Sequence, residues 1–110
     1  MCVDVSSTIL HGPQNVTVSS QSTANFRCES DGLTAIYWKY AEVTSGSSVT
    51  IFDRRGRNEK RFGERFVNTM KGTTSILTIR NVQKSDAGSY SCRERNSHIR
   101  WHAQLMVFGY

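Results

Sequence analysis

Apolar and polar side chains alternate along much of the chain, and this period of two predicts strands rather than helices. The clearest run is 88–93, in which Tyr90 and Cys92 fall on one face while serines and an arginine fall on the other. Residues 24–28 alternate in the same way, and so do residues 103–107. Each run is expected to bury one face and to leave the other in water.

Further strands are predicted between turn-forming stretches of glycine, serine and asparagine. They cover residues 3–10, 15–19, 22–29, 35–40, 49–52, 65–70 and 75–79. The Gly12-Pro13 step is expected to break the first strand and to let the chain change sheets. The polar stretch 44–48 is expected to form a hairpin loop, and Leu77 is expected to lie in the core. The pattern predicts an all-β protein.

Three features occur in a fixed order: Cys28, then Trp38, then the run 86–92, which reads Asp-Ala-Gly-Ser-Tyr-Ser-Cys. In this order they resemble an immunoglobulin-superfamily domain over nearly the whole chain. The resemblance implies an immunoglobulin-like β-sandwich, with a disulfide between Cys28 and Cys92 that joins strands B and F. It also implies that Trp38 packs in the core and that Tyr90 forms a tyrosine corner.

The resemblance is closest to the variable type, either V-set or I-set. Between Trp38 and Arg65 the chain is longer than a constant-type domain needs, which makes room for a C′ strand and a C″ strand in a variable-type Greek key. The resemblance also implies a structural salt bridge between Arg65 and Asp86. Antigen-receptor domains carry a glycine-containing bulge after the F–G loop, but residues 101–104 contain no glycine, so antibody-like pairing is not expected.

The size and composition suit one globular domain spanning residues 1–110. The chain has 110 residues, of which 37% are hydrophobic and 21% are charged. No apolar run approaches the roughly 18 residues of a membrane span, so we expect a soluble piece of a longer protein, with Met1 as an added start residue and membrane attachment only through other parts. Cys2 is left without an expected partner; it is either a terminal thiol or a link to a neighbouring domain or chain.

The cysteine pair implies an oxidising compartment, hence an extracellular protein at the cell surface or a secreted one. The sequon Asn15-Val16-Thr17 agrees with this address and makes Asn15 a candidate glycosylation site. Catalysis is not expected, because the chain has no nucleophile elbow and its three histidines, His11, His98 and His102, lack the spacing of metal ligands. No cofactor or metal is predicted.

The best candidate for recognition is the F–G loop, residues 94–100, together with the exposed face of strands C and F. Arginine and tryptophan are the residue types most enriched at interface hot spots. The candidates for partner contact in the loop are Arg95, Asn96, His98, Ile99, Arg100 and Trp101. Those on the face are Tyr37, Lys39, Ser91 and Arg93, and the B–C loop at 31–33 is a further candidate. Trp101 has an alternative role, packing back onto the edge of the sandwich. The first hypothesis is an immune or adhesion receptor domain that binds another protein and can form a homodimer through this face.

A second basic region has two interpretations. It contains Arg54, Arg55, Arg57, Lys60 and Arg61. One interpretation is a solvated edge, partly neutralised by Asp53, Glu59 and Glu64. The other is a strip that docks an acidic protein or a sulfated glycan, as in a secreted or matrix protein. The net charge of +5 suits an acidic partner. Nucleic acid is not expected, because no aromatic side chains alternate with these arginines. A structural module of an intracellular filament protein is disfavoured by the sequon and by the extra length that makes room for C′ and C″.

Overall fold

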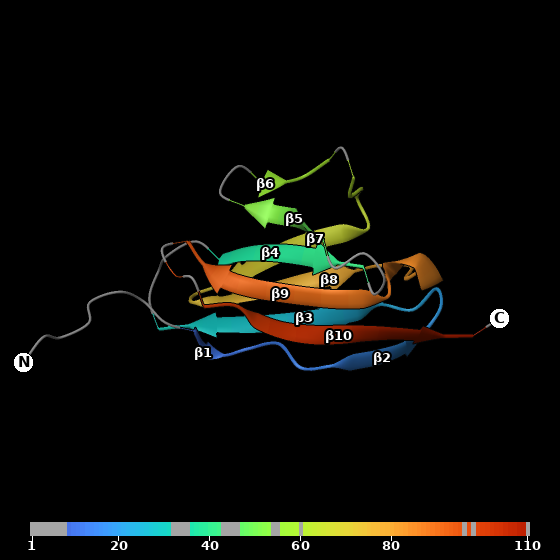
Figure 1. Cartoon of the computed structure of the whole chain (residues 1–110), viewed down its shortest axis with the longest axis horizontal. Helices are drawn as coiled ribbons and strands as arrows, with labels where there is room; N and C mark the ends of the chain where they lie inside the picture. Colours follow the sequence, from blue (N-terminus) through green and yellow to red (C-terminus); the bar gives the residue numbers. More distant parts are fainter. Residues whose placement is uncertain are drawn as a thin grey trace, which may run out of the picture.

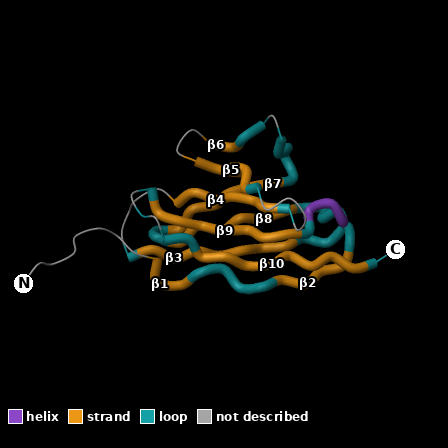
Figure 2. Tube along the Cα trace, in the orientation of Figure 1, coloured by secondary structure: helices purple, strands orange, loops and turns teal. Residues whose placement is uncertain are grey.

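The computed structural model shows a sandwich of two β-sheets packed face to face (Figure 1). The structure describes residues 9–31, 36–42, 47–53, 56–59, 61–95, 97 and 99–109. Within these residues nearly all regular structure is strand, and the one helical segment is a single 3-10 turn, η1 (Lys84–Asp86) (Figure 2). The prediction of an all-β immunoglobulin-like sandwich is therefore confirmed.

The smaller sheet has four strands in the order β1-β3-β8-β7. These are β1 (Ile9–His11), β3 (Ala24–Ser30), β8 (Thr74–Ile79) and β7 (Phe66–Lys71). All neighbours in it are antiparallel. Strands β3 and β8 alternate between buried and less buried residues along their length, as the period of two predicts.

The larger sheet has six strands in the order β2-β10-β9-β4-β5-β6. These are β2 (Val16–Ser19), β10 (Trp101–Phe108), β9 (Gly88–Glu94), β4 (Ile36–Ala41), β5 (Ser48–Asp53) and β6 (Gly56–Arg57). Strand β2 runs parallel to β10, and the other pairs are antiparallel. Because β1 and β2 belong to different sheets, the chain changes sheets at the Gly-Pro step, as predicted. Strands β5 and β6 occupy the positions expected of C′ and C″.

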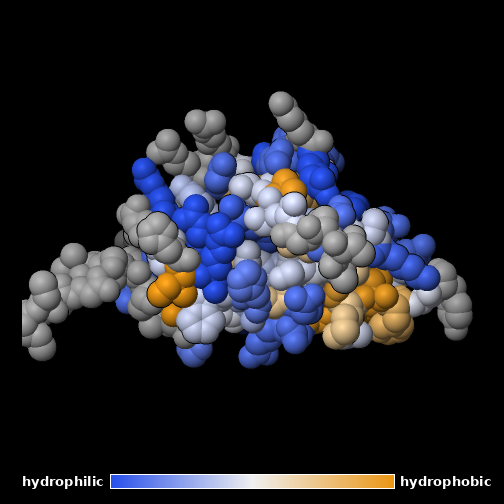
Figure 3. All heavy atoms as spheres, viewed as in Figure 1, coloured by the Kyte–Doolittle hydropathy of each residue, from blue (hydrophilic) through white to orange (hydrophobic). Residues whose placement is uncertain are grey.

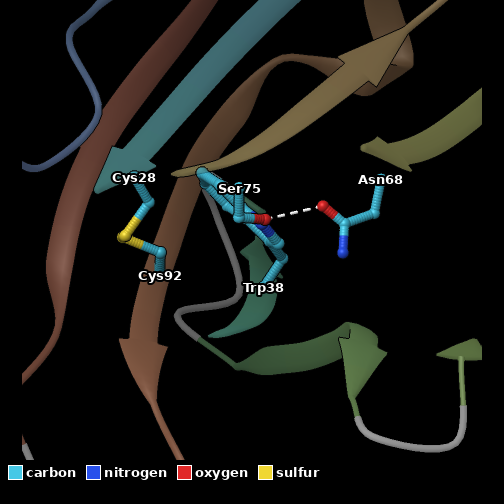
Figure 4. Close-up of a disulfide and its surroundings, with 5 residues drawn as sticks. All are labelled: Cys28, Trp38, Asn68, Ser75 and Cys92. Carbon is cyan, nitrogen blue, oxygen red and sulfur yellow. Dashed lines mark hydrogen bonds between the residues drawn. A yellow bond between two sulfur atoms is a disulfide. The ribbon is translucent and has the colours of Figure 1, made fainter. Parts of the chain in front are cut away.

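The centre of the sandwich is the disulfide between Cys28 and Cys92, whose Cα atoms lie 6.5 Å apart. It closes a loop of 64 residues, which a chain-entropy model values at about 4 kcal/mol. Beside it Trp38 is fully buried (Figure 4). Its indole Nε1 donates a hydrogen bond to Ser75 Oγ at 2.8 Å, and that hydroxyl donates to Asn68 Oδ1 at 2.6 Å (Figure 4). Ser75 of β8 therefore satisfies the one polar atom of the buried indole, and Asn68 of β7 in turn accepts from the Ser75 hydroxyl.

Two tyrosines hold the corner at the start of β9. The Tyr90 hydroxyl donates to the Asp86 carbonyl at 2.6 Å, which is the geometry of a tyrosine corner. The Tyr40 hydroxyl donates to the Ala87 carbonyl at 2.8 Å. Burial, reinforced by nearby carboxylates, raises the pKa of both phenols, so both stay neutral donors at physiological pH.

Arg65 and Asp86 form the ion pair expected of this fold, at the same end of the sandwich. Arg65 Nη1 lies 2.8 Å from Asp86 Oδ2, and Nη2 lies 3.2 Å from Oδ1. The same carboxylate accepts a hydrogen bond from the Gln83 backbone amide. Arg65 Nη1 also donates to the carbonyls of Arg80 and Asn81, so the pair joins the chain before η1 to the start of β7. The hydrogen bond to Asp86 is the main cause that raises the pKa of Arg65.

Some boundaries and environments differ from the predictions. Strand β10 begins at Trp101 rather than at residue 103, and β9 extends through Glu94, which is 1% exposed and belongs to no loop. Ser91 is on the outer face but only 7% exposed, because neighbouring side chains cover so small a residue. Phe62, which directly follows the charged segment 53–61 and belongs to no predicted strand, is buried against Tyr40 and Phe66.

Candidate functional site

The outer face of the six-stranded sheet brings together the predicted face residues of β4 and β9. Tyr37 pairs with Arg93, and Lys39 pairs with Ser91 in the next row. On the other side of β9, Ser91 pairs with His102 of β10. Since directly paired residues of a sheet project to the same side, these five side chains share one surface. Figure 3 looks onto this face and shows a hydrophilic region over β4 and β9.

This face carries concentrated positive charge. Burial, together with the positive charges of Arg100 and Arg93, lowers the pKa of Lys39. Along β4, β9 and β10, the positions that alternate with the buried core residues carry no acidic side chain. The acidic group of the adjoining strand, Asp53, stands at the end of β5. We name Lys39, Arg93 and Arg100 the cationic cluster.

Arg93 also makes contacts within the domain. Its guanidinium lies 4.8 Å from the centre of the Tyr37 ring, a cation–π contact. Its Nη1 donates to the backbone carbonyls of Glu94, Arg95 and Ser97 at 3.2, 3.1 and 3.4 Å. Arg93 therefore clamps the chain that leaves β9 onto strand β4. No pattern in the sequence distinguishes this task from direct contact with a partner.

The F–G loop projects from the end of this face. Arg95, Ile99 and Arg100 are exposed, Ile99 to 63%. The Ser97 amide donates to the Glu94 carbonyl at 3.1 Å, and the Ile99 amide donates to Ser97 Oγ at 3.1 Å. The loop candidates Asn96 and His98 lie outside the described residues.

Trp101 does not share the outer face with the cationic cluster. It is the first residue of β10 and pairs with Cys92, whose side chain points into the sandwich. A methyl group added to Gly12 would lie 2.8 Å from Trp101 Cε3, so the indole packs on the chain between β1 and β2. The side chain is still 42% exposed. From the sequence, Trp101 has two possible roles, contact with a partner or packing on the edge of the sandwich. The structure places it on the edge.

The geometry of the two sheets, the disulfide and the corner agrees with comparison to known families. The immunoglobulin V-set domain model matches residues 11–107.

The chain belongs to the immunoglobulin V-set family.

Two proteins similar to this V-set domain are much longer than it. It is 34% identical over 89 residues to a fibroblast growth factor receptor of Ciona intestinalis, a match that covers 78% of this chain and 10% of the receptor. It is 31% identical over 86 residues to matrix-remodeling-associated protein 5 of Homo sapiens, covering 78% of this chain and 3% of that protein. The chain thus spans a small part of either relative. Family and relatives together indicate an extracellular domain with a general recognition role.

In the second basic region of the V-set domain, residues 54–61, the two arginines that the structure describes form ion pairs with carboxylates. Arg57 Nη2 lies 2.9 Å from Glu59 Oε1, and its Nη1 donates to the Phe66 carbonyl. Arg61 Nη2 lies 2.9 Å from Glu42 Oε1. These contacts match the interpretation of a neutralised, solvated edge. Arg54, Arg55 and Lys60 lie outside the described residues.

The remaining candidates of the V-set domain lie apart from the cationic cluster or outside the description. Asn15 is exposed before β2, and its Oδ1 accepts a hydrogen bond from the Gln104 amide at 2.9 Å. His11 lies 3.8 Å from Glu29. Cys2 and most of the B–C loop fall outside the described residues.

In the described part of the chain, no three side chains of histidine, cysteine, aspartate or glutamate gather as a metal site would require. Nor does any helix in that part have the length and apolarity needed to span a membrane. V-set domains are typically non-enzymatic.

Proposed function

We propose that this V-set domain is the recognition domain of a cell-surface immune or adhesion receptor and docks an acidic protein surface on its outer face. The observation that carries the proposal is the cationic cluster. Burial lowers the pKa of Lys39, and the nearby positive charges of Arg100 and Arg93 lower it further. The outward positions of β4, β9 and β10 offer no carboxylate in return.

A partner carboxylate would relieve an existing electrostatic cost. The lowered pKa of Lys39 means that the folded domain disfavours the charge on this side chain. An opposite charge brought within about 4–6 Å favours the charged form, so docking would raise the same pKa. Arg100 is exposed and can offer its forked donors to a carboxylate. The domain's net charge of +5 would speed the encounter with an acidic surface.

The clamp supports the proposal by giving the site a defined shape. Arg93 fixes the chain after β9 by three carbonyl contacts, and the Tyr37 ring fixes the guanidinium. A preorganised loop loses less conformational entropy when a partner binds. The sulfated-glycan alternative draws less support, because Arg57 and Arg61 already have carboxylate partners.

Charge reversal on fluorescent tetramers of the domain tests this function. Lys39→Glu and Arg100→Glu should each weaken binding to partner-bearing cells by about tenfold or more, since close interfacial charge pairs are worth more than about 1.4 kcal/mol. The matched control is Lys71→Glu, which makes the same charge change on the exposed end of β7. The melting temperature of each variant, measured beside that of the wild type, separates loss of binding from loss of folding.

Treatment of the cells separates the two partner classes. Binding that disappears after surface proteolysis and survives heparinase indicates a protein partner; binding that disappears after heparinase treatment alone indicates the glycan alternative. Equal losses with Lys71→Glu, or binding that survives both reversals on the outer face, would refute docking at the cationic cluster.

A further inference from the structure

The side chain of Asn15 is held in a fixed orientation on the surface. Asn15 lies in the exposed chain between β1 and β2. Its Oδ1 accepts a hydrogen bond from the Gln104 backbone amide at 2.9 Å. Within the described part of the chain, its Nδ2 has no hydrogen-bond partner. The nitrogen is therefore free while the oxygen anchors the carboxamide to strand β10.

The surroundings of this nitrogen leave room for a large group. Strand β2 is an edge strand of the six-stranded sheet and pairs with β10 on one side. Asn15 also lines a surface hollow of about 510 Å³ between the β1–β2 segment and the outer face of β3. The polar walls of the hollow include His11, Gln14, Asn25, Arg27 and Glu29. Such a wall offers donors and acceptors to hydroxyl and acetamido groups.

Residues 15–17 form an Asn-x-Thr sequence, and the chain contains no other Asn-x-Ser or Asn-x-Thr. We propose that Asn15 carries an N-linked oligosaccharide whose first sugar lies against this hollow and covers the open edge of β2. Nδ2 attacks C1 of the reducing-end sugar of a polyprenyl-diphosphate-linked donor. The N–C1 bond forms as the C1–O bond to diphosphate breaks. Polyprenyl diphosphate leaves with the electron pair, and Nδ2 gives one proton to a base of the transferring enzyme.

The attached sugar would protect a vulnerable edge. An unpaired strand edge is a template for pairing with another chain, and proteins commonly block such edges. Attachment through Nδ2 leaves Oδ1 able to accept from Gln104, so modification would preserve the anchoring hydrogen bond. This site lies apart from the cationic cluster, and its test needs no binding partner, so the two proposals can fail separately.

Attachment is tested by expressing the full chain in the secretory pathway of mammalian cells. The wild type and Thr17→Ser, which keeps the sequon, should migrate as glycoproteins and should shift down after peptide N-glycosidase treatment. Thr17→Ala and Asn15→Asp should migrate at the shifted position without treatment. Thr17→Ala keeps the Asn15 hydrogen bond, so it separates loss of the glycan from loss of the anchor. A wild type that does not shift, or a shift that persists in Thr17→Ala, would overturn the proposal.

Trimming tests whether the first sugar packs on the hollow. Protein made with high-mannose glycans can be cut to a single remaining sugar or stripped completely; stripping converts the asparagine to an aspartate, which keeps its acceptor oxygens. The single-sugar form should keep the melting temperature of the intact glycoprotein, and the stripped form should melt lower. Asn15→Asp, produced without a glycan, should match the stripped form. Equal melting temperatures for all forms would show that the sugar does not pack against the domain.

Discussion

Gly88 illustrates how one residue of a motif is required by its backbone and its surroundings. Its φ is +147°, a conformation that favours glycine. A methyl group there would lie 2.6 Å from the Ala41 carbonyl oxygen and 2.9 Å from a Tyr40 ring carbon. Strand β9 can therefore approach β4 at this corner because position 88 has no side chain.

We expect Gly88→Ala to lower the free energy of unfolding by about 2–4 kcal/mol, from backbone strain and overpacking together. Gly72→Ala is the control: its φ is +61°, but nothing lies within 4 Å of the added methyl group. It should cost about 1–2 kcal/mol, from the left-handed backbone alone. Denaturant unfolding measures both. If the two variants lose the same stability, crowding at Ala41 and Tyr40 has no role.

The sequence predicts the tyrosine corner at the start of β9, but it does not predict the hydrogen bonds between buried side chains. The spacing from Asp86 to Cys92 is local, so the tyrosine corner can be inferred from the chain alone. The hydrogen bonds from Trp38 through Ser75 to Asn68 cannot, because they depend on the packing of one sheet on the other. The sequence around Ser75 does not indicate which side chains its hydroxyl will bind.

At the scale of elements, alternation predicts most strands, because each sheet buries one face. Alternation does not predict a position where a charged side chain is buried or where a core residue lies outside an alternating run. Glu94 is charged, so the end of β9 looks like a loop, yet it is buried. Phe62 stands directly after the charged segment 53–61, and no alternation surrounds it, so the sequence does not predict its core position against Tyr40.

The candidate face was predictable in part for the same reason. Alternation about Trp38 and Cys92 places Tyr37, Lys39 and Arg93 on the outer face without any knowledge of pairing. The sequence leaves Trp101 open between a role in the loop and packing on the sandwich edge, because its environment depends on where β10 begins and on its contact with Gly12.

The clamp between β9 and β4 gives a prediction about the element that follows β9. Arg93→Lys keeps the positive charge but lacks the planar guanidinium that stacks on Tyr37 and its multiple donors. Amide exchange at Ser97 and Ile99 should accelerate, while global stability should change by less than about 1 kcal/mol. Arg27→Lys, an exposed change on β3, is the control and should leave both amides unaffected. Unchanged exchange at Ser97 and Ile99 in Arg93→Lys would show that the clamp does not order the loop.

At the scale of the whole molecule, the distribution of charge bears on self-association. The sequence leaves open a homodimer through the outer face. A two-fold dimer places the same patch of both copies against itself. The cationic cluster of one copy would then approach that of the other, and like charges with no intervening carboxylate repel. The arrangement that suits an acidic partner therefore opposes pairing of identical copies.

We expect the oxidised domain to be monomeric by light scattering at an ionic strength of about 0.01 M, where the screening length is about 30 Å. Any association through the outer face should strengthen toward about 1 M salt, where screening shortens to about 3 Å. Lys39→Gln combined with Arg100→Gln should weaken the repulsion and favour association at low salt. Lys71→Gln combined with Arg80→Gln removes as much charge from the other sheet and should have less effect. A stable wild-type dimer at low salt, with no strengthening in the outer-face variant, would mean that the cationic cluster does not control how this domain pairs.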